Sequence, residues 1–247
     1  MATLQCQNQT FENIQAIVFD KDGTLAEVES YLKSLGQKRA RLVDAKIPGV
    51  QEPLMLAFGM ETSGINPMGL LAVGSRRENE IAAAAYVAET GRDWAEALIV
   101  AAGAFQEAES YLTPKAPHTP LLPHIAAWLS QLQQSGLKLG ILSADTTNNV
   151  KAFIDTYQLS SRIHAYQGVD SIDLSKPDPK LYEAICQKLD VPPQHTLMIG
   201  DSTLDMQMAC AAGSAGCIGV TWGWKTGVAI AQATCILTEP QQLKILS

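Results

Sequence analysis

An α/β fold with a doubly wound parallel sheet and an inserted all-helical domain is the architecture that this sequence predicts. Three observations predict it. Short apolar runs alternate with helical patterns from about residue 114 to residue 237, which is typical of a parallel sheet. A further apolar run, from Ile14 to Phe19, lies far upstream of that region. Between the two, residues 26–112 show helix after helix and no convincing strand. The helical block is therefore expected to be inserted after the first strand of the sheet.

The first strand and the helical block have clear local signals. Ile14 to Phe19 is apolar except for Gln15, so it predicts a short buried strand. In the helical block, Ser75 and Glu78 have the spacing of a capping box. Asp93 is expected to cap the helix after it. The helices predicted in this block are residues 28–46, 53–60, 76–89 and 94–111.

After a proline-rich connector at residues 114–123, strands and helices alternate. Pro123 is expected at the first position of a helix that runs to Gln134, and Asp178 is expected to cap another helix. The strands predicted in this part are residues 137–143, 163–168, 196–200, 217–221 and 233–237. The helices predicted are residues 123–134, 144–157, 179–189 and 204–212, with a last short helix ending at residue 246.

Composition limits the classes of function. The chain has 247 residues, of which 47% are hydrophobic, and a net charge of -7. The acidic balance disfavours nucleic-acid binding, which needs a basic stripe. No segment is apolar for the length of a membrane span, and residues 1–10 show no secretory signal. Five cysteines, an odd number without a C-x-x-C pair, are expected to be reduced, mostly buried thiols of a cytoplasmic protein.

Polar residues directly follow the predicted apolar strands at several points in the sequence. Two acids, Asp20 and Asp22, follow the first strand and precede Gly23 and Thr24. In a parallel sheet these strand ends meet in one crevice. Four carboxylates, a hydroxyl and an ammonium gathered there suit magnesium-assisted phosphoryl transfer. The four segments are Asp20-Lys21-Asp22-Gly23-Thr24, Leu139-Gly140-Ile141-Leu142-Ser143, Ser175-Lys176-Pro177-Asp178-Pro179 and Gly200-Asp201-Ser202-Thr203-Leu204-Asp205.

In this order, the four segments strongly resemble the motifs of the haloacid dehalogenase-like (HAD) superfamily of phosphohydrolases. The resemblance covers residues 14–24 and about 114–237. It implies a HAD-like Rossmannoid core domain at residues 1–25 and 113–247. Residues 26–112 would be a helical cap domain, similar to that of the subgroup containing phosphoglycolate phosphatase and β-phosphoglucomutase.

The resemblance also implies a role for each motif residue. Asp20 would be the nucleophile that forms an aspartyl-phosphate, and Asp22 the general acid and base. Lys176 would balance the charge of Asp20 and the phosphoryl group. Mg²⁺ would be held by Asp20, the backbone carbonyl of Asp22, and Asp201. The remaining roles fall to Asp205, which would hold Lys176 or a bound water, to Ser143 and the N–H of Ala144, which would bind phosphate oxygens, and to Thr24, which would order the loop or the Asp22 side chain at the substrate site.

For some other residues, a structural role is at least as good an interpretation as a functional one. The side chain of Lys21 is expected to point away from the two acids, towards the cap. The segment Trp222-Gly223-Trp224-Lys225 follows a predicted strand, so it has two interpretations: it borders the site or, as is favoured, it packs in the core or at the rim. Arg76 and Arg77 fit a substrate contact or a solvated helix start equally well.

The expected function is that of a Mg²⁺-dependent phosphatase acting on a small phosphorylated metabolite, with no nucleic-acid or membrane partner. Asp22 makes dehalogenation the poorer interpretation, because cleavage of a carbon–halogen bond needs no protonated leaving oxygen. Two alternatives stay open: a β-phosphoglucomutase-like phosphomutase, and a non-catalytic HAD-like binding protein.

Overall fold

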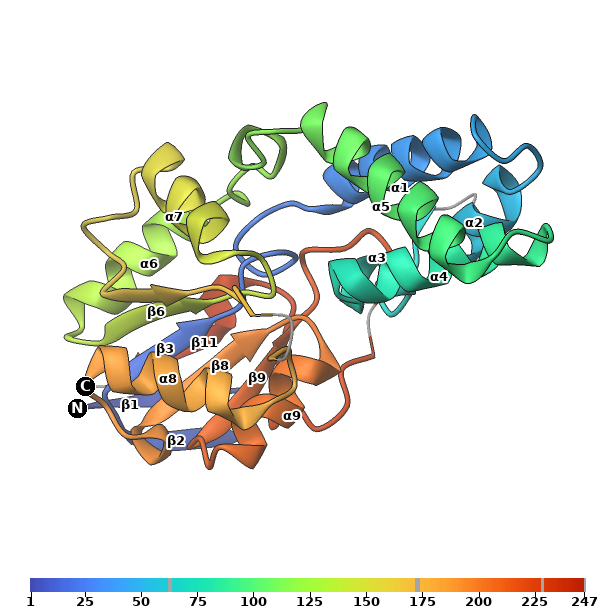
Figure 1. Cartoon of the computed structure of the whole chain (residues 1–247). Coiled ribbons are helices and arrows are strands. Elements are labelled where there is room, and N and C mark those ends of the chain that lie inside the picture. Colours follow the sequence, from blue (N-terminus) through green and yellow to red (C-terminus); the bar gives the residue numbers. More distant parts are fainter. Residues whose placement is uncertain (62–63, 172–173, 228, 247) are drawn as a thin grey trace. The chain divides into compact units, whose positions relative to one another are not determined.

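The structure is a computed structural model that describes residues 1–61, 64–171, 174–227 and 229–246. The chain divides into two compact units (Figure 1). One contains residues 1–28 and 119–247, and the other contains residues 29–118. The first unit thus takes in the first strand and the C-terminal part of the chain, and the second is a continuous insertion between them.

A six-stranded parallel sheet forms the centre of the first unit. Its order is β10-β9-β8-β3-β6-β7, so strands that follow β3 in sequence lie on both sides of it. All four residues of β3 are buried, as a strand covered on both faces requires. This confirms the predicted doubly wound α/β fold. The strands are β3 (Ala16–Phe19), β6 (Lys138–Leu142), β7 (Ala165–Gln167), β8 (Thr196–Gly200), β9 (Gly216–Val220) and β10 (Cys235–Leu237).

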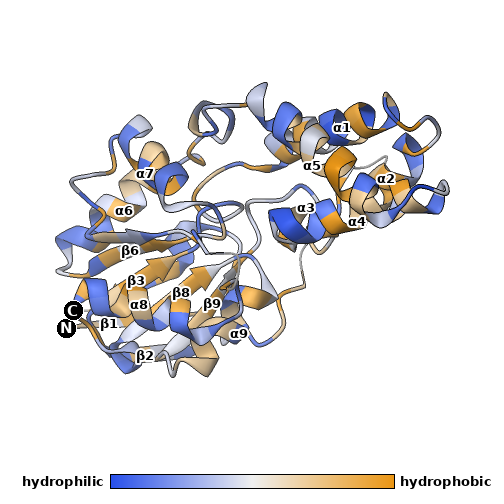
Figure 2. Ribbon diagram, viewed as in Figure 1, coloured by the Kyte–Doolittle hydropathy of each residue, from blue (hydrophilic) through white to orange (hydrophobic). Residues whose placement is uncertain are grey.

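Alternate residues of each strand point to opposite faces of the sheet, and helices pack against the residues of both faces. Val18 packs in a cluster with residues of α8 (Pro179–Leu189) and α9 (Thr203–Ala211). The ring of Phe19 instead meets Trp128 of α6 (Ile125–Gln134), with 5.4 Å between the ring centroids. A further helix, α7 (Thr147–Thr156), contacts β7. Hydrophobic residues predominate in the central strands, whereas the helices around them carry both hydrophobic and hydrophilic residues (Figure 2).

A second, antiparallel sheet in this unit was not predicted. Its order is β11-β1-β2, from β1 (Ala2–Cys6), β2 (Gln9–Ile14) and β11 (Leu243–Leu246). The predicted strand from Ile14 to Phe19 is thus two strands separated at Gln15. The short helix expected to end at residue 246 is wrong as well, because the chain there pairs with β1 after a 3₁₀ turn, Pro240–Gln242. Strands of four to six residues at the two ends of a chain find partners only in the folded state.

The prediction that all five cysteines are free thiols is wrong. Cys6 of β1 and Cys235 of β10 form a disulfide whose Cα atoms are 6.4 Å apart. The two residues are 229 positions apart in sequence, so no local spacing could have indicated the pair. Cys186 and Cys217 are buried free thiols, and Cys210 is an exposed one. Burial raises the pKa of Cys186 to about 11 and that of Cys217 to about 12.

Helix capping in this unit follows the sequence at one helix and departs from it at another. Asp178 caps α8, with Pro179 at its start, as predicted. The helix expected to begin at Pro123 begins instead at Ile125, after His124 in a left-handed conformation. A 3₁₀ turn at Pro193–His195 leads into β8.

The second unit is built from helices and one very short hairpin. Its helices are α1 (Glu29–Asp44), α2 (Gln51–Ala57), α3 (Leu70–Val73), α4 (Arg76–Glu89) and α5 (Trp94–Ser110), followed by a 3₁₀ turn, Ala116–His118. Ser75 and Glu78 form the predicted capping box, and Asp93 caps α5. The hairpin, β4 (Met60–Glu61) with β5 (Gly64–Ile65), was not predicted in a domain expected to be all helical.

Within the part of the chain that the structure describes, no helix has the length and apolar character needed to cross a bilayer.

Candidate active site

The carboxyl ends of three neighbouring strands bring the predicted site residues together. Phe19 at the end of β3 is in register with Ile141 of β6 and Ile199 of β8. The N–H of Asp20 donates to the carbonyl of Ile199 at 2.9 Å, which extends this pairing by one residue. Asp201 directly follows β8. Because β3 has later strands on both sides, its end is the position where open α/β sheets bind ligands.

Asp20 lies against a buried lysine. The Lys176 ammonium donates to Asp20 Oδ1 at 2.5 Å and to Asp205 Oδ1 at 2.7 Å. All three side chains are at least nine-tenths buried. Burial raises the pKa of Asp20 to about 6; Lys176 opposes this shift and Asp205 adds to it. Burial also disfavours the charged form of Lys176, but Asp20 and Asp205 outweigh it and hold the lysine's pKa above its usual range.

The second oxygen of Asp205 caps the helix on which it lies. The N–H and the hydroxyl of Ser202 donate to Asp205 Oδ2 at 3.2 and 2.6 Å, which completes a capping box at the start of α9. A side chain at Gly200 would lie 2.6 Å from the same oxygen, so the close approach of the β8 end to Asp205 requires glycine. Asp205 therefore has both oxygens engaged, one by Lys176 and one by the helix start.

Asp201 receives hydrogen bonds from two sides. Thr24, fully buried, donates its hydroxyl to Asp201 Oδ1 at 3.1 Å. Trp224 donates its indole N–H to Asp201 Oδ2 at 2.6 Å. Burial, together with the charges of Asp20 and Asp205, raises the pKa of Asp201 well above its usual range. Trp224 thus borders the candidate site, which was the less favoured of the two interpretations of this segment from the sequence.

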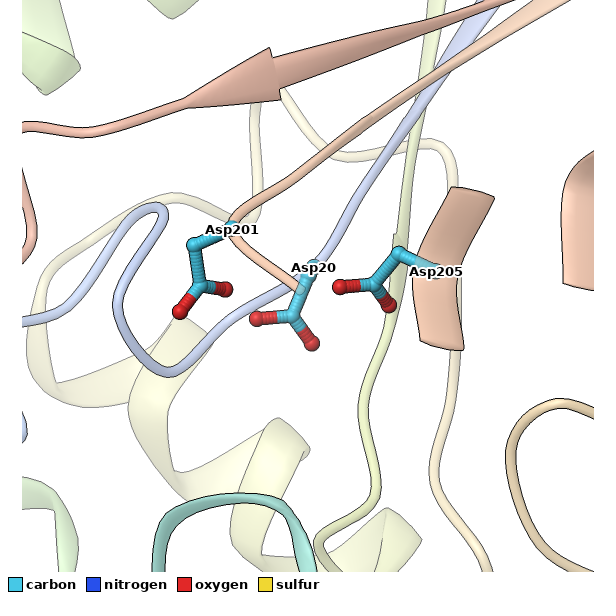
Figure 3. Close-up of side chains that lie close together, drawn as sticks. All are labelled: Asp20, Asp201 and Asp205. Carbon is cyan, nitrogen blue, oxygen red and sulfur yellow. The ribbon is translucent and has the colours of Figure 1, made fainter. Parts of the chain in front are cut away.

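The carboxylates of Asp20, Asp201 and Asp205 fit a divalent cation. Figure 3 shows them side by side, with Asp20 between the other two. One oxygen from each lies within 4.8 Å of the others, and all three residues are buried. Burial is the main cause of the raised pKa values of Asp20 and Asp201, and repulsion between the acids adds to it. Mg²⁺ prefers oxygen ligands. The donor set therefore suits Mg²⁺.

The loop after β3 is held in place by a second loop. The indole N–H of Trp222 donates to the carbonyl of Thr24 at 2.9 Å. A Cβ atom at Gly223 would lie 1.8 Å from the carbonyl oxygen of Gly23, so the two backbones touch. Gly23 itself has a φ of +84°, and a Cβ atom added to it would lie 2.2 Å from Asp201 Oδ2. Both glycines are thus required by the packing of the two loops.

The end of β6 supplies the remaining predicted residues. Ser143 is buried, its N–H donates to the carbonyl of Gln167, and its hydroxyl accepts from the N–H of Asp145 at 3.1 Å. Ala144 is exposed beside it. The hydroxyl of Ser143 is thus engaged within its own loop, whereas Ala144 is exposed to solvent.

Lys21 does not point away from the acids as predicted. Its side chain is 1% exposed, and its ammonium lies 2.5 Å from Asp22 Oδ1 and 3.2 Å from Asp145 Oδ2. The sequence could not indicate the contact with Asp145, because that residue follows a different strand.

The arginines Arg76 and Arg77 pair within their own unit. Arg76 contacts Glu80 at 2.7 Å and Glu109 at 2.9 Å, and Arg77 lies 3.7 Å from Glu80. Of the two interpretations open from the sequence, these ion pairs favour a structural role at the start of α4.

Comparison with known proteins identifies the family. A family model described as a haloacid dehalogenase-like hydrolase matches residues 14–213. Phosphoglycolate phosphatase of Salmonella typhimurium is 34% identical over 122 residues, which are 49% of this chain and 46% of that protein. The aligned part is thus about half the length of that relative.

Solved structures share the fold. A phosphoglycolate phosphatase predicted for Haemophilus somnus has a TM-score of 0.67 at 18% identity, covering 92% of this chain and 95% of that one. A HAD-superfamily hydrolase of subfamily IA, variant 1, from Geobacter sulfurreducens has a TM-score of 0.59 at 18% identity, covering 93% and 94%. With the family model spanning both the strand-end motifs and the inserted unit, the chain belongs to the haloacid dehalogenase-like hydrolases.

Proposed function

We propose that the protein is a Mg²⁺-dependent phosphatase that hydrolyses a small phosphorylated metabolite through an aspartyl-phosphate intermediate. One observation carries the proposal. Asp20, at the end of the central strand, lies 2.5 Å from a buried lysine and beside two further buried acids. A carboxylate nucleophile, a fixed cation and a set of metal ligands are the parts that phosphoryl transfer to an aspartate needs.

Asp20, Asp201 and the backbone carbonyl of Asp22 would hold Mg²⁺. When bound, the ion neutralises charge on the phosphoryl oxygens and on the acids around them. Asp205 is assigned to anchoring Lys176, since one of its oxygens accepts from that ammonium and the other caps α9. Thr24 holds Asp201 through its hydroxyl.

The proposed reaction has two steps, and residues of the chain carry out the proton transfers and the nucleophilic attack. Asp20 attacks phosphorus while Asp22 donates a proton to the leaving oxygen, so the P–O bond to the alcohol breaks as the bond to Asp20 forms. Asp22, now a carboxylate, takes a proton from a water that attacks the aspartyl-phosphate. Phosphate leaves and Asp20 is restored. Lys176, Ser143 and the N–H of Ala144 stabilise the phosphoryl oxygens in both steps.

Asp22 supports a phosphatase rather than a dehalogenase. Its side chain is 25% exposed, whereas the side chain of Asp20 is 8% exposed, so it can reach a solvent-borne leaving group. An acid in this position serves a leaving alkoxide, which needs a proton. A leaving halide needs none.

The substrate class rests on the relatives. The curated relative named above is a phosphoglycolate phosphatase, and we propose a small phosphorylated metabolite of this type as substrate. Residues 29–118 would act as a cap that selects it and excludes water while the aspartyl-phosphate forms.

Phosphate release from a panel of phosphorylated metabolites, with Mg²⁺ and after chelation, tests the proposal. The panel contains phosphoglycolate, hexose phosphates and nucleoside monophosphates. We expect Mg²⁺-dependent release from at least one of them and its loss in Asp20→Asn, with an aspartyl-phosphate trapped in the native protein. Full activity of Asp20→Asn would contradict the mechanism. Isomerisation of a hexose phosphate without phosphate release would identify a phosphomutase, and binding without turnover would identify a non-catalytic relative.

A further inference from the structure

Lys21 is a buried cation that the proposed mechanism does not use. It stands between Asp20 and Asp22 in the sequence, and its side chain is 1% exposed. Removing an ammonium from water is unfavourable unless acids compensate its charge. The position of Lys21 therefore depends on the acids that it contacts, and these acids lie on two different loops at strand ends.

One partner anchors the lysine. Asp145 lies 3.2 Å from the Lys21 ammonium and its side chain is 10% exposed. The side-chain amide of Asn149 in α7 donates to Asp145 Oδ1 at 2.7 Å, and the N–H of Thr146 donates to the same oxygen at 3.1 Å. The start of α7 thus fixes Asp145, and Asp145 fixes one side of the ammonium.

The other partner is the proposed acid and base. The Lys21 ammonium donates to Asp22 Oδ1 at 2.5 Å, in a charge-assisted hydrogen bond. The ring of Phe153, also in α7, lies 5.6 Å from the ammonium, within the range of a cation–π contact. A continuous series of contacts therefore runs from α7 through Asp145 and Lys21 to a carboxyl group at the edge of the site.

We propose that Lys21 is a positioning residue: held by Asp145, it fixes the carboxyl group of Asp22 in the orientation in which Asp22 protonates the leaving oxygen. This inference rests on the proposed phosphatase function and adds to it a residue specific to the acid step. It also links the loop after β3 to the loop after β6, which carries Ser143.

A positioning role for the acid has a kinetic signature that a purely structural role lacks. An alkyl phosphate needs its leaving oxygen protonated, whereas p-nitrophenyl phosphate has a leaving group that departs without a proton. The ratio kcat/KM reports only steps up to formation of the aspartyl-phosphate, because that step releases the alcohol. A defect in the acid should therefore appear in kcat/KM for the alkyl phosphate and not for p-nitrophenyl phosphate.

The test compares Lys21→Met with the matched control Lys151→Met. Methionine keeps the length and apolar stem of lysine without its charge. Lys151 lies in α7, but its ammonium is exposed and pairs with Asp155. For Lys21→Met we expect a loss of about 10²-fold in kcat/KM for the alkyl phosphate, the scale of general acid catalysis, and less than about 3-fold for p-nitrophenyl phosphate. Lys151→Met should change neither.

An equal loss for both substrates, or no loss for either, would overturn the positioning role. A Mg²⁺ titration followed by tryptophan fluorescence gives a readout apart from activity, because Trp224 contacts Asp201. Lys21→Met should bind Mg²⁺ with unchanged affinity. A weakened affinity would mean that Lys21 supports the metal site, and would also overturn the proposal.

Asp145→Asn keeps the test decisive if Lys21→Met does not fold. It should produce the same substrate-selective loss, smaller in size, and the double variant should be no worse than Lys21→Met, because the two residues act in series. Unchanged substrate selectivity in Asp145→Asn would count against the proposal. If the native protein releases no phosphate from any substrate, the proposed function itself fails, and this inference fails with it; that result is recognisable without any variant.

Discussion

Each unit of the protein buries a cation against carboxylates, but the two environments differ. In the first unit, Lys176 faces Asp20 and Asp205, with Asp201 close by. In the second, Arg39 of α1 donates to Glu109 of α5 at 2.8 Å, and its guanidinium lies 4.2 Å from the ring of Phe105.

The difference is in the charge that remains. The three buried acids around Lys176 leave a surplus of negative charge. Burial is the main cause that raises the pKa of Asp20 to about 6, and the charge of Asp205 adds to it. Around Arg39, Glu109 is shared with Arg76 and is 32% exposed, so solvent screens the pair, and burial lowers the pKa of Arg39. Stability alone does not favour a surplus of buried charge. The two units differ in that the candidate site gathers three buried acids around one ammonium, whereas the cation of the second unit faces a partly exposed glutamate; a cluster of buried like charges is the feature that indicates a functional site.

The largest expected effect is that of removing the cation in the first unit. Lys176→Met leaves Asp20 and Asp205 buried without their ammonium. We expect a loss of about 3–5 kcal/mol in the free energy of unfolding of the metal-free protein, and loss of phosphate release. Urea denaturation and a phosphate assay measure the two effects. A variant that keeps native activity would show that Lys176 has only a structural role.

Gly223→Ala is expected to come next. A Cβ atom there would lie 1.8 Å from the carbonyl oxygen of Gly23, so the loop that carries Asp20 and Asp22 must move. We expect a loss of activity of about 10²-fold, since small displacements of catalytic groups have effects of this size. Gly91→Ala in the second unit is the control. It has no atom within 4 Å of the added Cβ and a φ of +93°, so it should cost about 1 kcal/mol of stability and leave activity unchanged.

The surplus of buried acid should also appear as a pH dependence of stability. The pKa of Asp20 is raised by burial from 3.8 to about 6, so between these values the folded protein holds a proton that the unfolded chain releases. Stability of the metal-free protein should therefore fall as the pH rises from 4 to 6, by up to about 3 kcal/mol for this group. Asp201, whose pKa is raised in the same direction, adds to the fall.

The contribution of Asp20 is isolated by comparison with Asp20→Asn. Urea denaturation after chelation, at several pH values between 4 and 7, should give a shallower fall for this variant than for the native protein. Adding Mg²⁺ should restore stability of the native protein above pH 6, where the acids are ionised, because a bound ligand stabilises the folded state. Parallel curves for the two proteins would show that Asp20 is not strained by its surroundings.

The smallest effect is expected from Arg39→Met in the second unit. Glu109 keeps Arg76 as a partner and is partly exposed, so the loss of stability should be about 1–2 kcal/mol. Activity towards p-nitrophenyl phosphate should stay within about 2-fold of the native value. A large loss of activity without a loss of stability would mean that the second unit places Arg39 on the substrate, and the contrast between the two units would then fail.

The sequence by itself determined the alternation of strands and helices that builds the parallel sheet, and the positions of the motif residues at its strand ends. Apolar runs such as Ile17 to Phe19 are strands because their residues are buried on both faces, and local caps such as Ser75 with Glu78 define helix starts. The acids Asp20 and Asp201 could be predicted as neighbours because each directly follows a parallel strand, and the ends of such strands meet at one edge.

Only the tertiary structure decided the contacts that join distant segments. The disulfide between Cys6 and Cys235, the pairing of β1 with β11, the hydrogen bond of Trp224 to Asp201 and the position of Lys21 between Asp22 and Asp145 all depend on which loops lie side by side. Period and capping act over a few residues, whereas these contacts are fixed by the packing of elements up to 229 residues apart. For that reason the residues proposed to carry the chemistry could be identified from the sequence, and the contacts that hold them in place could not.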